Sequence, residues 1–236
     1  MSRPPTPSPD DRFGIGAKLY CLWAATAIGV SMVLAGATAE TITRLLVLAF
    51  IAGQYMFRAR LMNALPRLAP RARFITMGVL LAAVVEGFHM ISKPVYSSLL
   101  VGLDTPPSHA LRLYAIDLLA TPPAYVLIFA VIWFFISRYR YGLWSYIVVM
   151  GLGQVLGDGG IFFFAAAPQL VIFLPYPMTN YHACNVLPFV ATRDALPVAR
   201  AGGRRGWVAV PALIAVYLVC GSVIKLVGRA AGLDPG

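Results

Sequence analysis

The chain has 236 residues, of which 59% are hydrophobic and 12% charged, and its formal net charge is +10 at pH 7. With a mean hydropathy of +0.77, a soluble domain of this length would leave too much apolar surface in water, so an ordinary soluble protein is excluded. Nucleic-acid binding is also excluded as the reason for the positive charge. The arginines cluster between apolar runs, where they direct membrane topology and meet anionic lipid headgroups of the bilayer.

The first 16 residues, MSRPPTPSPDDRFGIG, are polar and rich in proline. This composition predicts a disordered tail (1–16) rather than a secretory signal peptide, which would contain an apolar segment. The remainder, 17–236, is predicted to be a single all-α domain, a polytopic transmembrane helical bundle. Its three cysteines are widely spaced and match neither a disulfide framework nor a zinc site.

Seven apolar runs follow the tail, and most approach the roughly 18–20 residues that cross a bilayer as a helix. The runs lie at 17–37, 42–57, 74–92, 112–137, 141–157, 161–178 and 207–227. We therefore predict about seven spans. The rival prediction has six spans and a re-entrant segment formed by GDGGIFFFAAAP (157–168).

Clustered arginines orient these runs. They lie in the segments 58–73, 138–140 and 193–205. Because loops rich in Lys and Arg stay in the cytoplasm, the N-terminus is predicted to be cytoplasmic and the C-terminus external, in the cell inner (plasma) membrane. On this topology the segment 179–206 is a cytoplasmic loop. A proline pair, PP at 122–123, is expected to kink the fourth span.

Four ionisable residues lie in or at the ends of apolar runs, near the predicted outer side of the membrane: Glu86, His89, Asp117 and Asp158. A charged side chain in hydrocarbon costs on the order of 2.5–3.5 kcal/mol on insertion scales, so such residues normally face protein or a water-filled cavity. Glu86, Asp117 and Asp158 are therefore the candidate catalytic residues. Glu86 and His89 share a helix face at the Glu-x-x-His spacing of di-metal bundles, which makes His89 a candidate metal ligand.

Each of these residues also has a purely structural explanation. Glu86 and His89 are also consistent with an ordinary buried pair whose partner is Arg112 or a backbone carbonyl. Asp117 fits a hydrogen-bonding role, and Asp158, which precedes two glycines, fits a turn. His109 follows DTPPS and is expected to lie in the outer loop. His182, in TNYHACN, falls in the predicted cytoplasmic loop and so away from the outer cluster.

Read from end to end, the chain resembles the A subunit of the copper membrane monooxygenases, the family of particulate methane, ammonia and short-alkane monooxygenases. The resemblance lies in the order of its landmarks, VLAG (33–36), VVEG (84–87), AID (115–117), VVMGLGQVLGDGG (148–160) and PFVATRDALPVAR (188–200). The chain departs from the family after the glutamate, where GFHMISKPVYSSLL stands, and in GDGGIFF, where the family has a Pro-Gly-Asn-Trp-Pro turn.

The resemblance implies an integral-membrane subunit of an oxidase or monooxygenase complex that acts on a small apolar substrate. Glu86 and Asp117 are the two positions that carry over from the family. The copper would be held mainly by membrane partner subunits. This chain would form the wall of the hydrophobic substrate path, with Glu86 close to the metal.

Three other functions stay open from the residues themselves. Asp117 and Asp158 on neighbouring antiparallel spans match the two carboxyls of an intramembrane aspartyl hydrolase. Buried carboxylates also match a proton- or cation-coupled carrier. A structural or assembly subunit without chemistry of its own is the last alternative.

Overall fold

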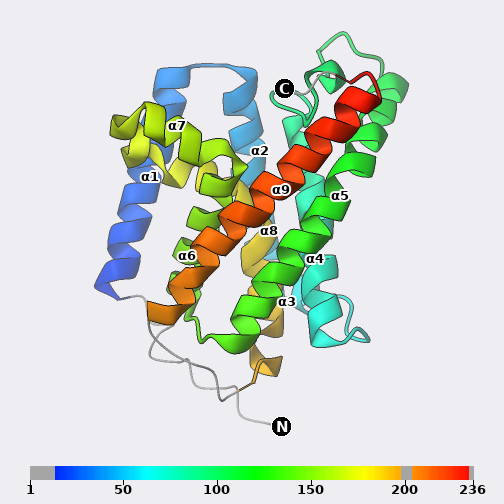
Figure 1. The fold of residues 1–236 in the computed structure, drawn as a ribbon. Helices are drawn as coiled ribbons and strands as arrows, with labels where there is room; N and C mark the ends of the chain where they lie inside the picture. The colour runs from blue at the N-terminus through cyan, green and yellow to red at the C-terminus, as the bar shows by residue number, and fades with distance from the viewer. Residues whose placement is uncertain (1–13, 198–203, 234–236) are drawn as a thin grey trace.

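The computed structural model describes residues 14–197 and 204–233, which form an all-helical protein (Figure 1). Most of the predicted tail, 1–13, lies outside the described residues, and the first helix already begins at Ile15. The α-helices are α1 (Ile15–Ala35), α2 (Ala39–Met56), α3 (Arg58–Met62), α4 (Pro70–His89), α5 (Pro107–Arg138), α6 (Leu143–Val155), α7 (Ile161–Ala166), α8 (Pro175–Thr192) and α9 (Ala209–Ala230). Short 3₁₀ turns and one π-helical segment (Leu156–Gly160) connect some of them.

The long helices start where their sequences favour a start. Pro70 and Pro107 each occupy the first turn of α4 and α5, where the missing N–H costs nothing. Thr38 caps α2 by accepting a hydrogen bond from the Thr41 N–H. The upper end of the bundle in Figure 1 is where α4 ends and α5 begins, and the lower end is where α4 begins and α5 ends.

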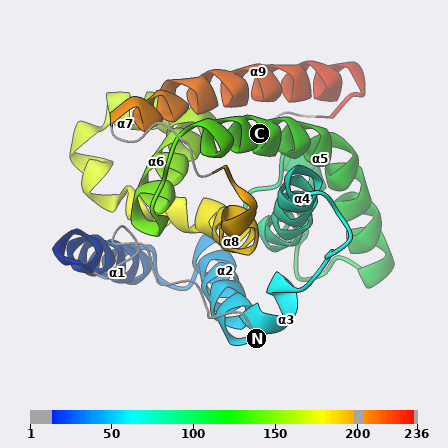
Figure 2. The ribbon, with the colours of Figure 1, turned by 90° about the horizontal axis from the view of Figure 1, so that it is seen from below.

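Helix α8 lies in the middle of the bundle, between α1 and α2 on one side and α4 and α6 on others (Figure 2). Helices α5 and α9 close the far side. The apolar interior is dominated by aromatic side chains, such as Phe74 and Phe129 with ring centroids 5.9 Å apart. Tyr146 of α6 stacks on Phe189 of α8 with centroids 3.9 Å apart. Helix α1 is peripheral, and most of its apolar surface is exposed.

The prediction of seven spans is wrong in number. Within the described residues, five helices are long and apolar enough to cross a membrane, which makes the chain a multi-pass membrane protein. They are Ile15–Ala35, Pro70–His89, Pro107–Arg138, Leu143–Ala166 and Arg205–Ala230. The predicted second span corresponds to α2, which has 18 residues and carries Glu40 and Arg44. The cytoplasmic placement of the N-terminus stays a prediction.

The predicted sixth span, 161–178, is not one helix. Its first residues form the short α7, which continues the span that begins at Leu143, and the rest is 3₁₀ structure up to the start of α8. Pro168 and Pro175 begin new segments because a proline cannot continue a helix from the preceding turn. The prediction that 179–206 is a cytoplasmic loop is also wrong, because residues up to Thr192 belong to α8.

Two glycines four residues apart bring α6 and the π-helical segment against α9. A Cβ on Gly153 would lie 2.9 Å from the Leu213 Cδ1 atom, and a Cβ on Gly157 would lie 2.6 Å from the Tyr217 Cβ atom and 3.0 Å from the Ile214 Cα atom. Helix backbones in membranes approach this closely only where small residues line the contact. The close approach holds α9 against the polar residues that follow.

Candidate functional site

Glu86 of α4 and Tyr125 of α5 form the first part of a polar cluster in the upper half of the bundle. The Tyr125 hydroxyl donates a hydrogen bond to the Glu86 Oε1 atom. Both side chains are half-buried. Glu86 also lies within electrostatic range of two further carboxyls, Asp117 and Asp158. The structure therefore links the three predicted catalytic carboxyls electrostatically through Glu86, and we call them the carboxyl cluster.

Asp117 is the most enclosed of the three carboxyls, with 0% of its surface exposed. The Val95 N–H donates to its Oδ1 atom at 3.3 Å, and among the described atoms its Oδ2 has no hydrogen-bond partner. One turn along α5, the Thr121 hydroxyl donates to the Asp117 carbonyl at 3.0 Å. Asp117 thus attaches the loop after α4 to α5. Burial, and secondly the nearby Asp117, raises the pKa of Tyr96 in that loop.

Asp158 lies in the π-helical segment that follows α6. The backbone leaves helical geometry there, with φ −82° and ψ 37° at Asp158 and φ 90° at Gly159, a value that favours glycine. The bend presents Asp158 to α8, where the Tyr181 hydroxyl donates to its Oδ2 atom at 2.6 Å. Its side chain is exposed, and Lys93 is an electrostatic neighbour. π-Bulges inside helices often lie at functional sites.

A second set of polar side chains continues from Tyr181 into the interior. The Tyr181 and Tyr217 rings meet edge to face at 6.1 Å. The Gln154 Nε2 atom donates to the Tyr217 hydroxyl at 2.8 Å, and the Asn185 Nδ2 atom donates to the Gln154 Oε1 atom. Gln154 and Asn185 are each 1% exposed. These bonds satisfy the Gln154 amide and the Asn185 Nδ2 atom, which would otherwise be costly to bury, whereas the Asn185 Oδ1 atom has no partner among the described atoms.

His89, the predicted metal ligand, lies one turn beyond Glu86 but faces a different set of residues. Asn180 is its hydrogen-bond partner, and Arg44, Glu40 and Lys93 are its charged neighbours. Within the described parts of the chain, no three His, Cys, Asp or Glu side chains lie together so that they could hold a metal ion. The structure therefore places His89 beside Asn180 and among the charges of Arg44, Glu40 and Lys93, and its role as a metal ligand stays a prediction.

Arg44 of α2 is the centre of this neighbouring group, and sequence reasoning did not single it out. It is 2% exposed. Its Nη1 atom donates to the Thr179 hydroxyl at 2.5 Å and to the Asn180 Oδ1 atom at 2.7 Å, and its Nη2 atom lies 3.3 Å from the Glu40 Oε1 atom. The guanidinium also lies 4.0 Å above the Tyr176 ring centroid. Arg44 thus joins α2 to the first turns of α8.

The remaining predicted residues lie apart from the carboxyl cluster. His109 is exposed in the first turn of α5. His182 is in α8, not in a loop, and its Nε2 atom is 2.7 Å from the Tyr20 hydroxyl of α1. Cys184, also in α8, is buried, and its thiol donates to the Asn180 carbonyl at 3.2 Å. The proline pair at 122–123 lies inside α5, which continues through it as one helix.

Five residues of the cluster were missed by sequence reasoning: Tyr125, Tyr181, Tyr217, Gln154 and Asn185. A weak signal for them exists, because a tyrosine, glutamine or asparagine inside an apolar helix needs a hydrogen-bond partner. That signal does not say which helices supply the partners. No family model, curated protein or solved structure matches the chain, so the candidate site rests on the arrangement of its own residues.

Proposed function

We propose that the protein is a proton-coupled membrane carrier in which Glu86 is the central proton-binding carboxyl. The observation that carries the proposal is a set of three carboxyls linked electrostatically through Glu86: the buried Asp117, the half-buried Glu86 and the exposed Asp158. Glu86 lies within electrostatic range of both Asp117 and Asp158, and tyrosine hydroxyls bind Glu86 and Asp158. Ionisable residues placed inside a membrane bundle mark ion pathways and proton relays.

The graded exposure of the three carboxyls supports a relay over isolated structural roles. Asp158 is exposed, Glu86 is half-buried and Asp117 is sealed. In order of decreasing exposure the series is Asp158, Glu86 and Asp117, and Glu86 is the electrostatic neighbour of both aspartates. Because like charges repel strongly in a low dielectric, the proton occupancy of each carboxyl depends on that of its neighbours. Because of this coupling, one proton can move between the three carboxyls without all three being ionised at the same time.

The arrangement favours a carrier over an aspartyl hydrolase. A hydrolase of that kind needs Asp117 and Asp158 to share a proton as general acid and base. Here Asp117 accepts from the Val95 N–H and Asp158 accepts from the Tyr181 hydroxyl. Glu86 is the electrostatic neighbour of both, so the middle of the series is a glutamate and not the pair of aspartates.

Infrared difference spectroscopy during a pH titration tests the proposal on the purified, detergent-solubilised chain. The stretching band of a protonated carboxyl group reports each carboxyl directly. Glu86→Gln is expected to remove one titrating band and to shift the other two, because the three groups titrate together. Tyr125→Phe should shift the Glu86 band without removing it, since the tyrosine donates to that carboxylate.

His109→Gln is the matched control, because His109 is a titratable residue of the same end of the bundle but is exposed in the first turn of α5. It should leave the carboxyl bands in place. Reconstitution into vesicles with a trapped pH indicator and an imposed potential then measures proton entry. Identical spectra for the parent chain and Glu86→Gln would refute the proposal.

A second candidate is the oxidase or monooxygenase subunit that the sequence resemblance implies. One observation favours it: Glu86 and Asp117, the two positions that carry over from that family, interact with each other. Copper would then be held by partner subunits and the substrate would be small and apolar. Purification of the tagged chain from native membranes tests this. Recovery of the chain with two membrane subunits and copper would support this second candidate function. Recovery of the chain alone and free of copper would refute it.

A further inference from the structure

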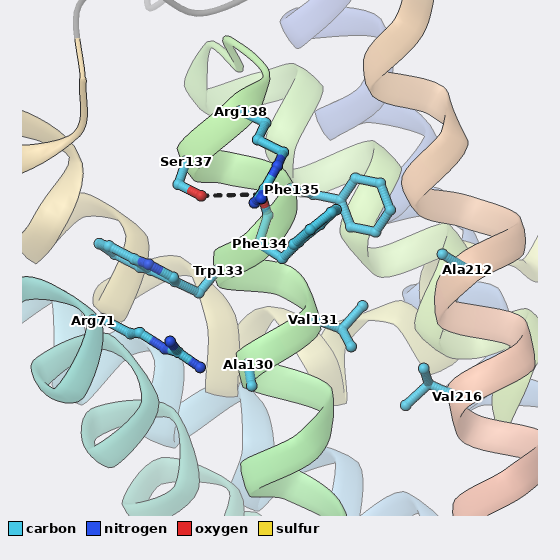
Figure 3. A pocket seen from close by; sticks show the side chains of 10 residues that line it. All are labelled: Arg71, Ala130, Val131, Trp133, Phe134, Phe135, Ser137, Arg138, Ala212 and Val216. Carbon is cyan, nitrogen blue, oxygen red and sulfur yellow. Dashed lines mark hydrogen bonds between the residues drawn. The ribbon is translucent and has the colours of Figure 1, made fainter.

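An open pocket of about 610 Å³ lies at the lower end of the bundle, far along the helices from the carboxyl cluster (Figure 3). Its apolar walls come from the last turns of α5 and the first turns of α9. Val131 and Phe135 face Ala212 and Val216, and Ala130 lies on the side of α5 that faces Arg71. Trp133 and Phe134 complete the apolar lining. The pocket opens on the outer face of the bundle, where lipid surrounds a membrane protein.

Two arginines also line this pocket. Arg71 is in the first turn of α4 and Arg138 is the last residue of α5, and both side chains are exposed. The Arg138 guanidinium lies 3.6 Å above the Phe134 ring centroid. Within the described residues, no carboxylate forms an ion pair with either arginine. The pocket therefore presents positive charge that the described part of the protein does not neutralise.

The charge of Arg138 and the apolar lining are separated along the axis of α5. Arg138 and Ala130 are eight residues apart on one helix, which corresponds to about 12 Å at 1.5 Å per residue. Arg138 is at the end of α5, where a bilayer has its headgroups, whereas the Arg71 guanidinium lies level with Ala130 on the side of α5 that faces α4 (Figure 3). The apolar walls continue from Arg138 into the depth of the hydrocarbon. This is the arrangement of a phospholipid, with an anionic phosphate above an acyl chain.

We propose that this pocket binds an anionic phospholipid, with its phosphate at Arg71 and Arg138 and an acyl chain against Val131, Ala212 and Val216. Basic pockets between transmembrane helices bind such headgroups, and the guanidinium fork suits phosphate oxygens. A free phosphate would use the arginines but would leave the apolar walls without a partner. The site is independent of the carboxyl cluster and of any function proposed for it.

Trp133 provides a local reporter, because it is one of four tryptophans and lines the pocket. The full chain with Trp23→Phe, Trp144→Phe and Trp207→Phe is reconstituted into phosphatidylcholine vesicles that contain a fixed fraction of acyl-brominated lipid. Brominated phosphatidylglycerol is expected to quench Trp133 more strongly than brominated phosphatidylcholine. The preference should be roughly fivefold for each arginine that contacts the headgroup.

Arg71→Gln with Arg138→Gln should abolish the preference, whereas Arg71→Lys with Arg138→Lys should retain most of it. The matched control is Arg60→Gln with Arg67→Gln, which removes the same charge from exposed positions outside the pocket and should leave the preference intact. Ala212→Phe, which fills the apolar part, should reduce quenching by both lipids.

Three outcomes would overturn the proposal. The first is equal quenching by the two brominated lipids. The second is an equal loss of preference in the control pair, which would indicate general attraction of a basic protein to anionic lipid. The third is release of the brominated phosphatidylglycerol by millimolar inorganic phosphate, which would identify a free-phosphate site. Thermal unfolding of every variant confirms that the chain remains folded.

Discussion

The upper and lower parts of the bundle differ in the surroundings of their charged side chains. In the upper half, tyrosine hydroxyls of α5 and α8 donate hydrogen bonds to Glu86 of α4 and to Asp158 of the π-helical segment, and Asp158 is the one of the three carboxyls that is exposed. At the lower end, the exposed side chains of Arg71 and Arg138 line an apolar pocket and form no ion pair within the described chain. The upper groups depend on protein partners, and the two arginines depend on water or lipid headgroups.

This difference predicts which substitutions should lower the free energy of unfolding. A buried polar group that loses its partner stays unsatisfied, at a cost of about 1–3 kcal/mol. An exposed arginine that is removed leaves no unsatisfied protein group, so its role is in recognition and not in stability. Four substitutions test this contrast through the midpoint of thermal unfolding in detergent, where 1 kcal/mol corresponds to about 2–4 °C for a chain of this size.

Gly157→Val should give the largest effect, because it separates α9 from the helix that carries Asp158. A Cβ at this position meets the Tyr217 Cβ atom and the Ile214 backbone, neither of which can move away freely. Overpacking of this kind costs about 3 kcal/mol. Gly53→Ala in α2, where an added Cβ meets nothing within 4 Å, is the control and should not destabilise. An unchanged midpoint for Gly157→Val would mean that α9 is not closely packed there.

Arg44→Ala should be the next most costly substitution, at about 2 kcal/mol, because hydrogen bonds to a charged group contribute about 1.5–3 kcal/mol. It removes the bonds from α2 to Thr179 and Asn180. Glu40→Gln should cost less, because Glu40 is 43% exposed and Arg44 keeps its other partners. Equal midpoints for the two variants would contradict the assignment of Arg44 as the link between α2 and α8.

Asn185→Ala should cost about 1–2 kcal/mol, since it leaves the Gln154 Oε1 atom buried without its donor. The Gln154 bond to the Tyr217 hydroxyl remains, which limits the loss. Asn63→Ala, at an exposed position after α3, should change the midpoint by less than about 0.5 kcal/mol. A neutral Asn185→Ala would show that this part of the network does not stabilise the fold.

Arg71→Gln with Arg138→Gln should have the smallest effect on stability, within about 0.5 kcal/mol in detergent that contains no anionic lipid. Both side chains are exposed and make no ion pair within the described chain. Addition of phosphatidylglycerol should raise the unfolding midpoint of the parent chain more than that of the double variant, because a ligand that binds only the folded state stabilises it. Equal increases would argue against the lipid pocket.

Much of the architecture could be predicted from apolar length alone. The runs at 17–37, 74–92, 112–137 and 207–227 each correspond to a candidate span, because a long apolar segment has few alternatives to a membrane helix. Helix α8 was missed for the opposite reason. Its polar residues, such as Asn180 and Asn185, are typical of a loop when read in isolation, but the surrounding helices shield them from lipid.

The sequence by itself determined that the chain is a multi-pass helical membrane protein and that Glu86, Asp117 and Asp158 require an unusual environment. Only the tertiary structure decided which partners they have. The gathering of three carboxyls around Glu86, the Tyr125 and Tyr181 hydroxyl donors and the separate position of His89 beside Arg44 all depend on how helices rotate and approach one another. The free energy of transferring a helix into the bilayer depends on the apolar length of that helix, which can be read from one segment of the sequence. Hydrogen bonds between helices depend on contacts between segments far apart in the chain, and no single segment contains that information.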